Sequence, residues 1–224
     1  DETSAALAVN LIRTRRADCI MKGLISTDIL LKALLNKDTG ILKRGHVLTH
    51  IGAMKIPTYN KMLFVSDSAV IPFPTLQQRI EMIKYAINVC HNFGIEQPRI
   101  ALIHCTEKIS PKFPITIDYQ QIVDMAKKGL FGNAIIDGPI DVKCACSKNA
   151  AEIKGINSPI NGLADVLIMP DIEAANAFYK ALTTFLDTDI ADALQGAECP
   201  VVLTSRSDSS AVKFDSLAMA CLTC

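Results

Sequence analysis

The sequence predicts an α/β protein with a mostly parallel sheet, because short apolar runs alternate with longer segments of helical periodicity. The last quarter shows this pattern most clearly. Pro200 precedes the apolar, β-branched run from Val201 to Leu203, which predicts a buried strand. After a polar segment, apolar residues recur at helical spacing between residues 211 and 221. A helix is therefore expected to begin near Ser209 or Ser210, with either serine as its N-cap.

The rest of the chain continues the alternation. A helix is expected from Thr3 to Arg16, then a strand from Cys19 to Met21 and a helix from Ser26 or Thr27 to about Leu35. Further strands are expected at residues 47–51, 62–65, 99–103, 134–136 and 166–169. A helix over 172–185 is marked by Ile172, Ala175, Tyr179, Leu182 and Phe185.

The clearest helix begins after the turn-rich segment from Asp67 to Pro74. Thr75 and Gln78 have the spacing of a capping box, and Gly94 is placed to end the helix. One face carries an apolar stripe, made by Leu76, Ile80, Ile83, Ile87 and Cys90.

Composition excludes several classes of protein. Half of the 224 residues are hydrophobic, which is typical of a globular chain rather than a disordered one. The 23 basic side chains balance 23 acidic ones, and this argues against nucleic-acid binding. No apolar run reaches the roughly 18 residues of a membrane span, and no signal-peptide pattern is present. A cytoplasmic protein without membrane contact is expected.

The cysteines predict neither disulfides nor a metal site. Most of the eight, including Cys19, Cys90, Cys105, Cys199 and Cys221, lie in apolar segments, where a free thiol packs as a small hydrophobe. Cys221 and Cys224 have redox or zinc spacing but lack a second pair. The four histidines are scattered, so each is expected to be a surface or core residue: His46, His50, His91 and His104.

The turn after Leu203 has the features of an anion site. A strand, a polar turn and a helix N-terminus follow one another, so free N–H groups and the positive end of the helix dipole point beyond the strand. Arg206 can hold a phosphate through two parallel hydrogen bonds, and Ser205 supplies a hydroxyl beside it. An ordinary capped loop with a solvated arginine fits the same spacing.

Four segments in order resemble the phosphate acetyl/butyryltransferase family, and the phosphate butyryltransferase branch in particular. Residues 203–209 (Leu-Thr-Ser-Arg-Ser-Asp-Ser), with Lys213 and Ser216-Leu217-Ala218 after them, are similar to the C-terminal signature of the family. The other three are Asp18 to Leu24, Asp137-Gly138-Pro139, and Gly162 to Asp171 with the following Asn176 and Tyr179-Lys180. The resemblance extends over essentially the whole chain.

The resemblance implies a fold of two α/β domains with mostly parallel sheets and a cleft between them, like that of isocitrate and isopropylmalate dehydrogenases. The first domain would comprise residues 1–76 plus 195–224, and the second would be an insertion of residues 77–194. The family has further βα units before this point, so the N-terminal part of the first domain is expected to be missing from the sequence. The apolar helices of the second domain favour a homodimer or a higher homo-oligomer.

The resemblance also implies the reaction acyl-CoA + phosphate ⇌ acyl phosphate + CoA by direct transfer, with butyryl-CoA or a similar short chain as substrate. No cofactor or metal is implied. Ser205 matches the proposed donor to the reacting carbonyl oxygen and Arg206 the proposed phosphate anchor. The acetyltransferase branch has an aspartate farther along the following helix, where this chain has none, so the base for the CoA thiol is Asp208, another group or solvent. Substrate contacts are expected from Lys22, Gly23, Asp67, Lys180 and Lys213.

Two other functions remain open. A non-catalytic, acyl-CoA-binding regulatory domain of the same fold is favoured by the missing helix carboxylate. A metal-dependent 3-hydroxyacid dehydrogenase shares this type of fold, but its paired metal-binding aspartates have no evident counterpart. The Ser205-Arg206 pair favours the acyltransferase.

Overall fold

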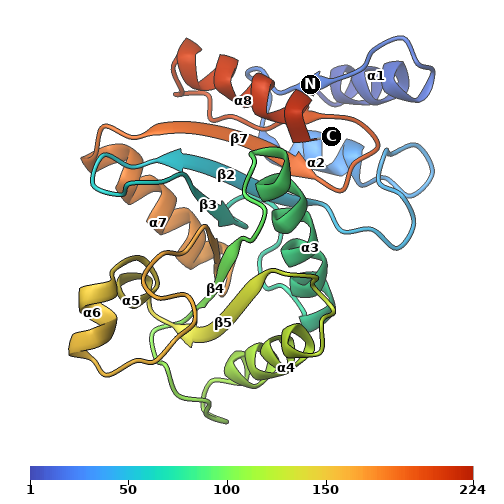
Figure 1. The fold of residues 1–224 in the computed structure, drawn as a ribbon. Coiled ribbons are helices and arrows are strands. Elements are labelled where there is room, and N and C mark those ends of the chain that lie inside the picture. The colour runs from blue at the N-terminus through green and yellow to red at the C-terminus, as the bar shows by residue number, and fades with distance from the viewer. Residues whose placement is uncertain (224) are drawn as a thin grey trace.

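The computed structural model describes residues 1–223, so Cys224 and its predicted pairing with Cys221 lie outside the described residues. One eight-stranded sheet runs through the molecule in the order β1-β8-β7-β2-β3-β6-β4-β5. Figure 1 shows helices on both faces of this sheet and the N- and C-terminal helices together at one end. The strands are β1 (Ile20–Met21), β2 (Thr49–Lys55), β3 (Leu63–Ser66), β4 (Arg99–Ile103), β5 (Ile135–Ile140), β6 (Val166–Ile168), β7 (Asp189–Gln195) and β8 (Val201–Val202).

The α/β class and the mostly parallel sheet are confirmed. Parallel pairing joins β1 to β8 and links β3, β6, β4 and β5. The antiparallel contacts all involve β2 or β7, which cross the middle of the sheet. The sequence analysis placed β2 at 47–51, whereas the strand runs to Lys55. It missed β7, whose buried Asp192 interrupts the apolar pattern that marks a core strand.

The predicted division into two domains stays a prediction. The single sheet crosses its proposed boundary, because β7, which lies in 77–194 except for Gln195, pairs between β8 and β2 of the other segment. Three buried clusters fill the core. The largest packs under α3 and α4, a second under α5 to α7, and a third between α1, α2 and the sheet edge formed by β1 and β8.

Most predicted helices are confirmed within a few residues. The helices are α1 (Glu2–Arg13), α2 (Thr27–Leu34), α3 (Leu76–Asn92), α4 (Ile115–Lys127), α5 (Val142–Cys146), α6 (Lys148–Ile153), α7 (Ile172–Phe185) and α8 (Ser210–Thr223). The Thr75–Gln78 capping box is present, and Gly94 follows α3 at φ +78°, a conformation that suits glycine. The sequence analysis missed α4, which follows Pro114 without a capping side chain.

The cysteine predictions hold only in part. None of the cysteines among residues 1–223 forms a disulfide. Cys90 and Cys199 are buried as expected and Cys19 is half-buried, but Cys105 and Cys221 are exposed. Each directly follows buried residues, His104 and Ala220, so an apolar neighbourhood in the sequence did not determine their burial. None of the helices among residues 1–223 is both long and apolar enough to span a membrane.

Candidate functional site

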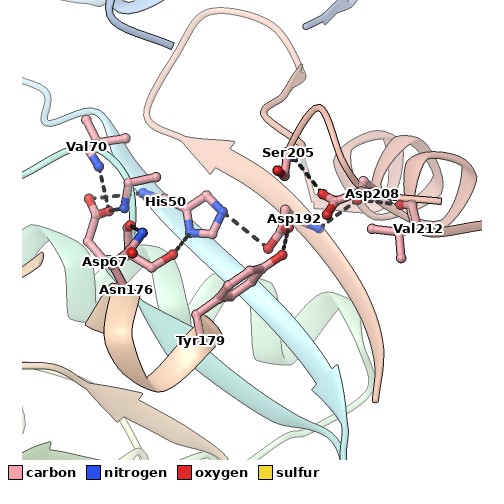
Figure 2. A network of polar contacts seen from close by, with 12 residues as sticks. His50, Asp67, Val70, Asn176, Tyr179, Asp192, Ser205, Asp208 and Val212 are labelled. Atoms are coloured by element: carbon pink, nitrogen blue, oxygen red, sulfur yellow. Dashed lines mark hydrogen bonds and ion pairs between the residues drawn. The ribbon is translucent and has the colours of Figure 1, made fainter. Parts of the chain in front are cut away.

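Residues that follow two strands meet side chains of β2, β7, α2 and α7 around a pocket of about 160 Å³. Ser205 and Thr204 come from the segment after β8, and Ser68 comes from the segment after β3. The rest of the lining is made by Thr27, His50, Ala69, Asn176, Tyr179, Lys180, Asp192 and Leu203. Figure 2 shows most of the polar members from close by.

The predicted strand, turn and helix are present at residues 201–223. Asp208 shapes the turn, because its Oδ2 accepts a hydrogen bond of 2.6 Å from the backbone N–H of Ser205. The Ser205 hydroxyl lies 3.0 Å from that of Ser207. Ser209 is the serine that caps α8, since its Oγ accepts from the N–H of Val212 at 3.2 Å. The hydroxyl of Ser205 is thus not required to begin the helix.

Three basic side chains gather at this turn. The backbone N–H of Lys22 bonds to the carbonyl of Val202 at 3.0 Å, which brings the end of β1 beside the end of β8. Burial lowers the pKa of Lys22, and the positive charges of Arg206 and Lys213 lower it further, while Asp208 opposes them. Because the charges of Arg206 and Lys213 both act on Lys22, the three cations lie in one electrostatic neighbourhood.

These cations have no carboxylate partner in the described part of the chain. The ion pairs formed within residues 1–223 involve other side chains. Lys22 is 5% exposed, and its ammonium group donates only to the carbonyls of Gly23 and Ile25. Gathered positive charge that no ion pair neutralises, beside a helix N-terminus, favours an anionic ligand.

A buried polar chain lies on the other side of the pocket (Figure 2). The Ser68 hydroxyl is 3.0 Å from Nδ1 of His50, and His50 Nε2 is 3.2 Å from Oδ1 of Asp192. The phenol of Tyr179 donates to the other oxygen of Asp192 at 2.8 Å. All four residues are at most 7% exposed. The sequence analysis treated His50 as a core or surface residue and did not name Ser68 or Asp192.

Asp192 is built into the sheet beneath the pocket. Its backbone N–H donates to Ser216 of α8 at 2.9 Å, and Gly52 faces it across the β2–β7 pair. A Cβ atom on Gly52 would lie 2.9 Å from Asp192 Oδ1, so the absence of a side chain there makes room for the carboxylate. Burial works against protonation of His50, but the charge and hydrogen bonding of Asp192, together with the charge of Asp67, outweigh it and raise the pKa of the imidazole. Burial and Asp192 together raise the pKa of Tyr179.

Asp67 holds a loop, and it is not among the residues that line this pocket. Its Oδ1 accepts from the backbone N–H groups of Ala69 and Val70 at 2.8 and 2.9 Å. Its Oδ2 accepts from the Thr49 hydroxyl and from the N–H groups of His50 and Ile71. The side chain is 2% exposed and accepts from five donors, which gives it a structural role. Its predicted substrate contact stays a prediction, and the adjacent Ser68 lines the pocket.

Of the other predicted residues, Lys180 lies at the pocket and Gly23 lies beside Lys22 at the turn. Lys180 lines the pocket, with its ammonium 5.3 Å from the centre of the Tyr179 ring. Gly23 is exposed after Lys22 and has open space where a Cβ would be, so its backbone is accessible.

One group of side chains elsewhere has metal-binding residue types. Glu107, Asp141 and Cys144 bring their ligand atoms within 4.8 Å of one another. Lys154 forms ion pairs with both carboxylates, and Asp141 also caps α5. Burial opposes ionisation of Asp141, but the hydrogen bonds from Lys154 and Cys144 hold its pKa at about 2. The ammonium of Lys154 already supplies the counter-charge that a cation would bring.

Fold and site together define an α/β protein in which three basic side chains gather at the turn after β8. Residues 2–221 match the sequence profile of the family described as phosphate acetyl/butaryl transferase. The chain is 37% identical to the phosphate butyryltransferase of Clostridium acetobutylicum over 98% of its length and 72% of that protein. It is 38% identical to the phosphate acetyltransferase of Thermotoga maritima over 97% of its length and 74% of that protein.

Solved structures agree. A branched-chain phosphotransacylase from Enterococcus faecalis V583 superposes with a TM-score of 0.85 at 33% identity, covering 98% of this chain and 78% of the other. A phosphotransacetylase from Streptococcus pyogenes gives a TM-score of 0.81 at 26% identity, covering 98% and 66%. The chain belongs to the phosphate acetyl/butyryltransferase family and is an acyltransferase of this type.

Proposed function

We propose that this protein transfers a short acyl group, butyryl or similar, between CoA and inorganic phosphate by direct transfer. The observation that carries the proposal is the turn at residues 204–210, where Lys22, Arg206 and Lys213 gather without a carboxylate partner among the described residues. The family supports phosphate acyltransfer, because its named relatives are phosphate butyryltransferases and phosphate acetyltransferases.

Two residues of the turn have the proposed chemical roles. Arg206 is exposed and holds the phosphate through its planar fork of donors. The Ser205 hydroxyl, bonded only to Ser207, is available to donate to the carbonyl oxygen of the acyl group as negative charge develops on it. Lys213 and Lys180 flank the turn and the pocket, where they can contact the phosphates of CoA.

The proposed reaction uses no metal or prosthetic group, because phosphate attacks a thioester that is already activated. Asp208 supports the turn through one carboxylate oxygen, which accepts from Ser205, so the base for the CoA thiol is Asp208, another group or solvent. If the chain is instead a regulatory domain of the same fold, acyl-CoA should bind to it without turnover.

The test is CoA release from butyryl-CoA, followed by the loss of thioester absorbance with and without inorganic phosphate. Butyryl phosphate should form only when phosphate is present, and hydroxylamine should capture it as the hydroxamate. Acetyl-CoA and a longer acyl-CoA in the same assay define the chain length. Equal CoA release without phosphate would identify a thioesterase, and binding without release would identify a regulatory domain.

A further inference from the structure

We propose that the Ser68 hydroxyl, positioned by His50 and Asp192, exchanges the proton with the CoA sulfur in this reaction. The proposal rests on the proposed function and assigns the base for the CoA thiol. A thiol with a pKa near roughly 8.5 is only a few per cent ionised at neutral pH, so a group that takes its proton accelerates the reaction.

The contacts fix the direction of the proton chain (Figure 2). The negative charge of Asp192 Oδ1, 3.2 Å from Nε2 of His50, repels a bare nitrogen lone pair and favours the proton on Nε2. Nδ1 is then a bare acceptor, and the Ser68 hydroxyl 3.0 Å away donates to it. The other oxygen of Asp192 is taken by Tyr179, so the carboxylate cannot turn away.

The same chain favours a positive charge on His50 once it has taken a proton. Within residues 1–223, Asp192 Oδ1 is buried and has no well-aligned hydrogen bond, despite its short distance to the imidazole. The electrostatic stabilisation of such an oxygen is greatest when the imidazole becomes an imidazolium. The charged and titratable groups around the ring are Asp192 on β7, Asp67 after β3, Tyr179 on α7 and, across the pocket, Lys180. Two carboxylates and one exposed ammonium lie around the ring, so the surrounding charge favours the protonated form of His50.

Ser68 is held rigidly where a substrate can reach it. The Asn176 amide donates to its carbonyl at 3.1 Å, and Asp67 binds the next two backbone N–H groups. Ser68 and Ser205 line the same pocket. An acyl carbonyl bound at Ser205 and a CoA sulfur bound at Ser68 therefore meet there and react with each other. Rigid support of this kind is what general acid–base catalysis requires.

The proton balance closes without another reactant. In the direction of thioester synthesis, the CoA thiol gives its proton to Ser68 Oγ, whose own proton passes to Nδ1 of His50. The sulfur bonds to the acyl carbon, and the bond from that carbon to the phosphate oxygen breaks. The departing phosphate takes a proton back by the same route. No acyl-serine forms.

The experiment follows butyryl-CoA formation from CoA and butyryl phosphate between pH 7 and about 9.5, with Ser68→Ala and His50→Gln variants. At pH 7 each should lower kcat by about 10²-fold or more, while the KM values change little. The loss should shrink as pH passes the pKa of the thiol, because an ionised thiol needs no base. His46→Gln, a change at an exposed histidine outside the pocket, is the matched control and should leave the rate unchanged.

Melting curves separate chemistry from folding. If the buried His50→Gln variant is unstable, Ser68→Ala alone decides, since it removes a single hydroxyl. Three results would each overturn the proposed proton exchange through Ser68. They are losses of equal size at every pH, variants as fast as the wild type, and capture of butyryl-Ser68. A wild type that forms no thioester at any pH would refute the proposed function itself, and the proton exchange with it.

Discussion

Asp67→Asn should destabilise the protein rather than weaken substrate binding. The carboxylate accepts five hydrogen bonds in a buried position, and the amide that replaces it has only one acceptor oxygen. If that oxygen stays with Ala69 and Val70, the new NH₂ group faces the N–H groups of His50 and Ile71. Two buried donors then lose their acceptor at about 1–3 kcal/mol each. Since the Ile71 contact is long at 3.3 Å, the expected loss is roughly 2–4 kcal/mol.

Thermal and urea unfolding measure this loss. For a chain of this size, 1 kcal/mol corresponds to about 2–4 °C in Tm, so a fall of roughly 5–15 °C is expected. Asp171→Asn is the matched control, because Asp171 is an N-cap that accepts one hydrogen bond, and asparagine caps about as well. The reasoning would be refuted if Asp67→Asn kept its Tm and instead raised the KM for phosphate or acyl-CoA, as a substrate contact would.

Other perturbations test the anion site and the surface. Ser205→Ala should lower kcat by about 10²–10³, with little change in Tm because Ser209 caps α8; a rate within tenfold of wild type would exclude the oxyanion role. Arg206→Ala should raise the KM for phosphate more than that for acyl-CoA, and the reverse order would assign Arg206 to CoA. EDTA should leave the rate unchanged, and a loss restored by a divalent metal would contradict the metal-free reaction. Because the folded-state pKa of Asp141 is lowered to about 2, its ion pair stabilises the protein above the unfolded value near 4 and is lost between about pH 4 and 2. Lys154→Met should therefore lower Tm at neutral pH but not at pH 2, and a difference that persists at pH 2 would show another cause.

The strands and helices with strong local signals could be predicted from the sequence. Thr75 and Gln78 begin α3 as expected because a capping box involves only neighbouring residues. The strand, turn and helix around Ser205 and Arg206 were also predictable, since Pro200, a β-branched run and a serine cap lie within a few residues of one another. The family resemblance added the reaction, which no local pattern specifies.

Only the tertiary structure decided which polar residues meet. Asp67 and Ser68 are adjacent in the sequence, yet one binds five backbone and side-chain donors and the other faces the pocket. His50, Asp192 and Tyr179 come from β2, β7 and α7, and they meet because β2 and β7 pair in a register that places Gly52 opposite Asp192. Capping and periodicity act over a few residues and can be recognised in the sequence. Strand register and the contacts across it join distant segments, so the proton chain exists only once the sheet has formed.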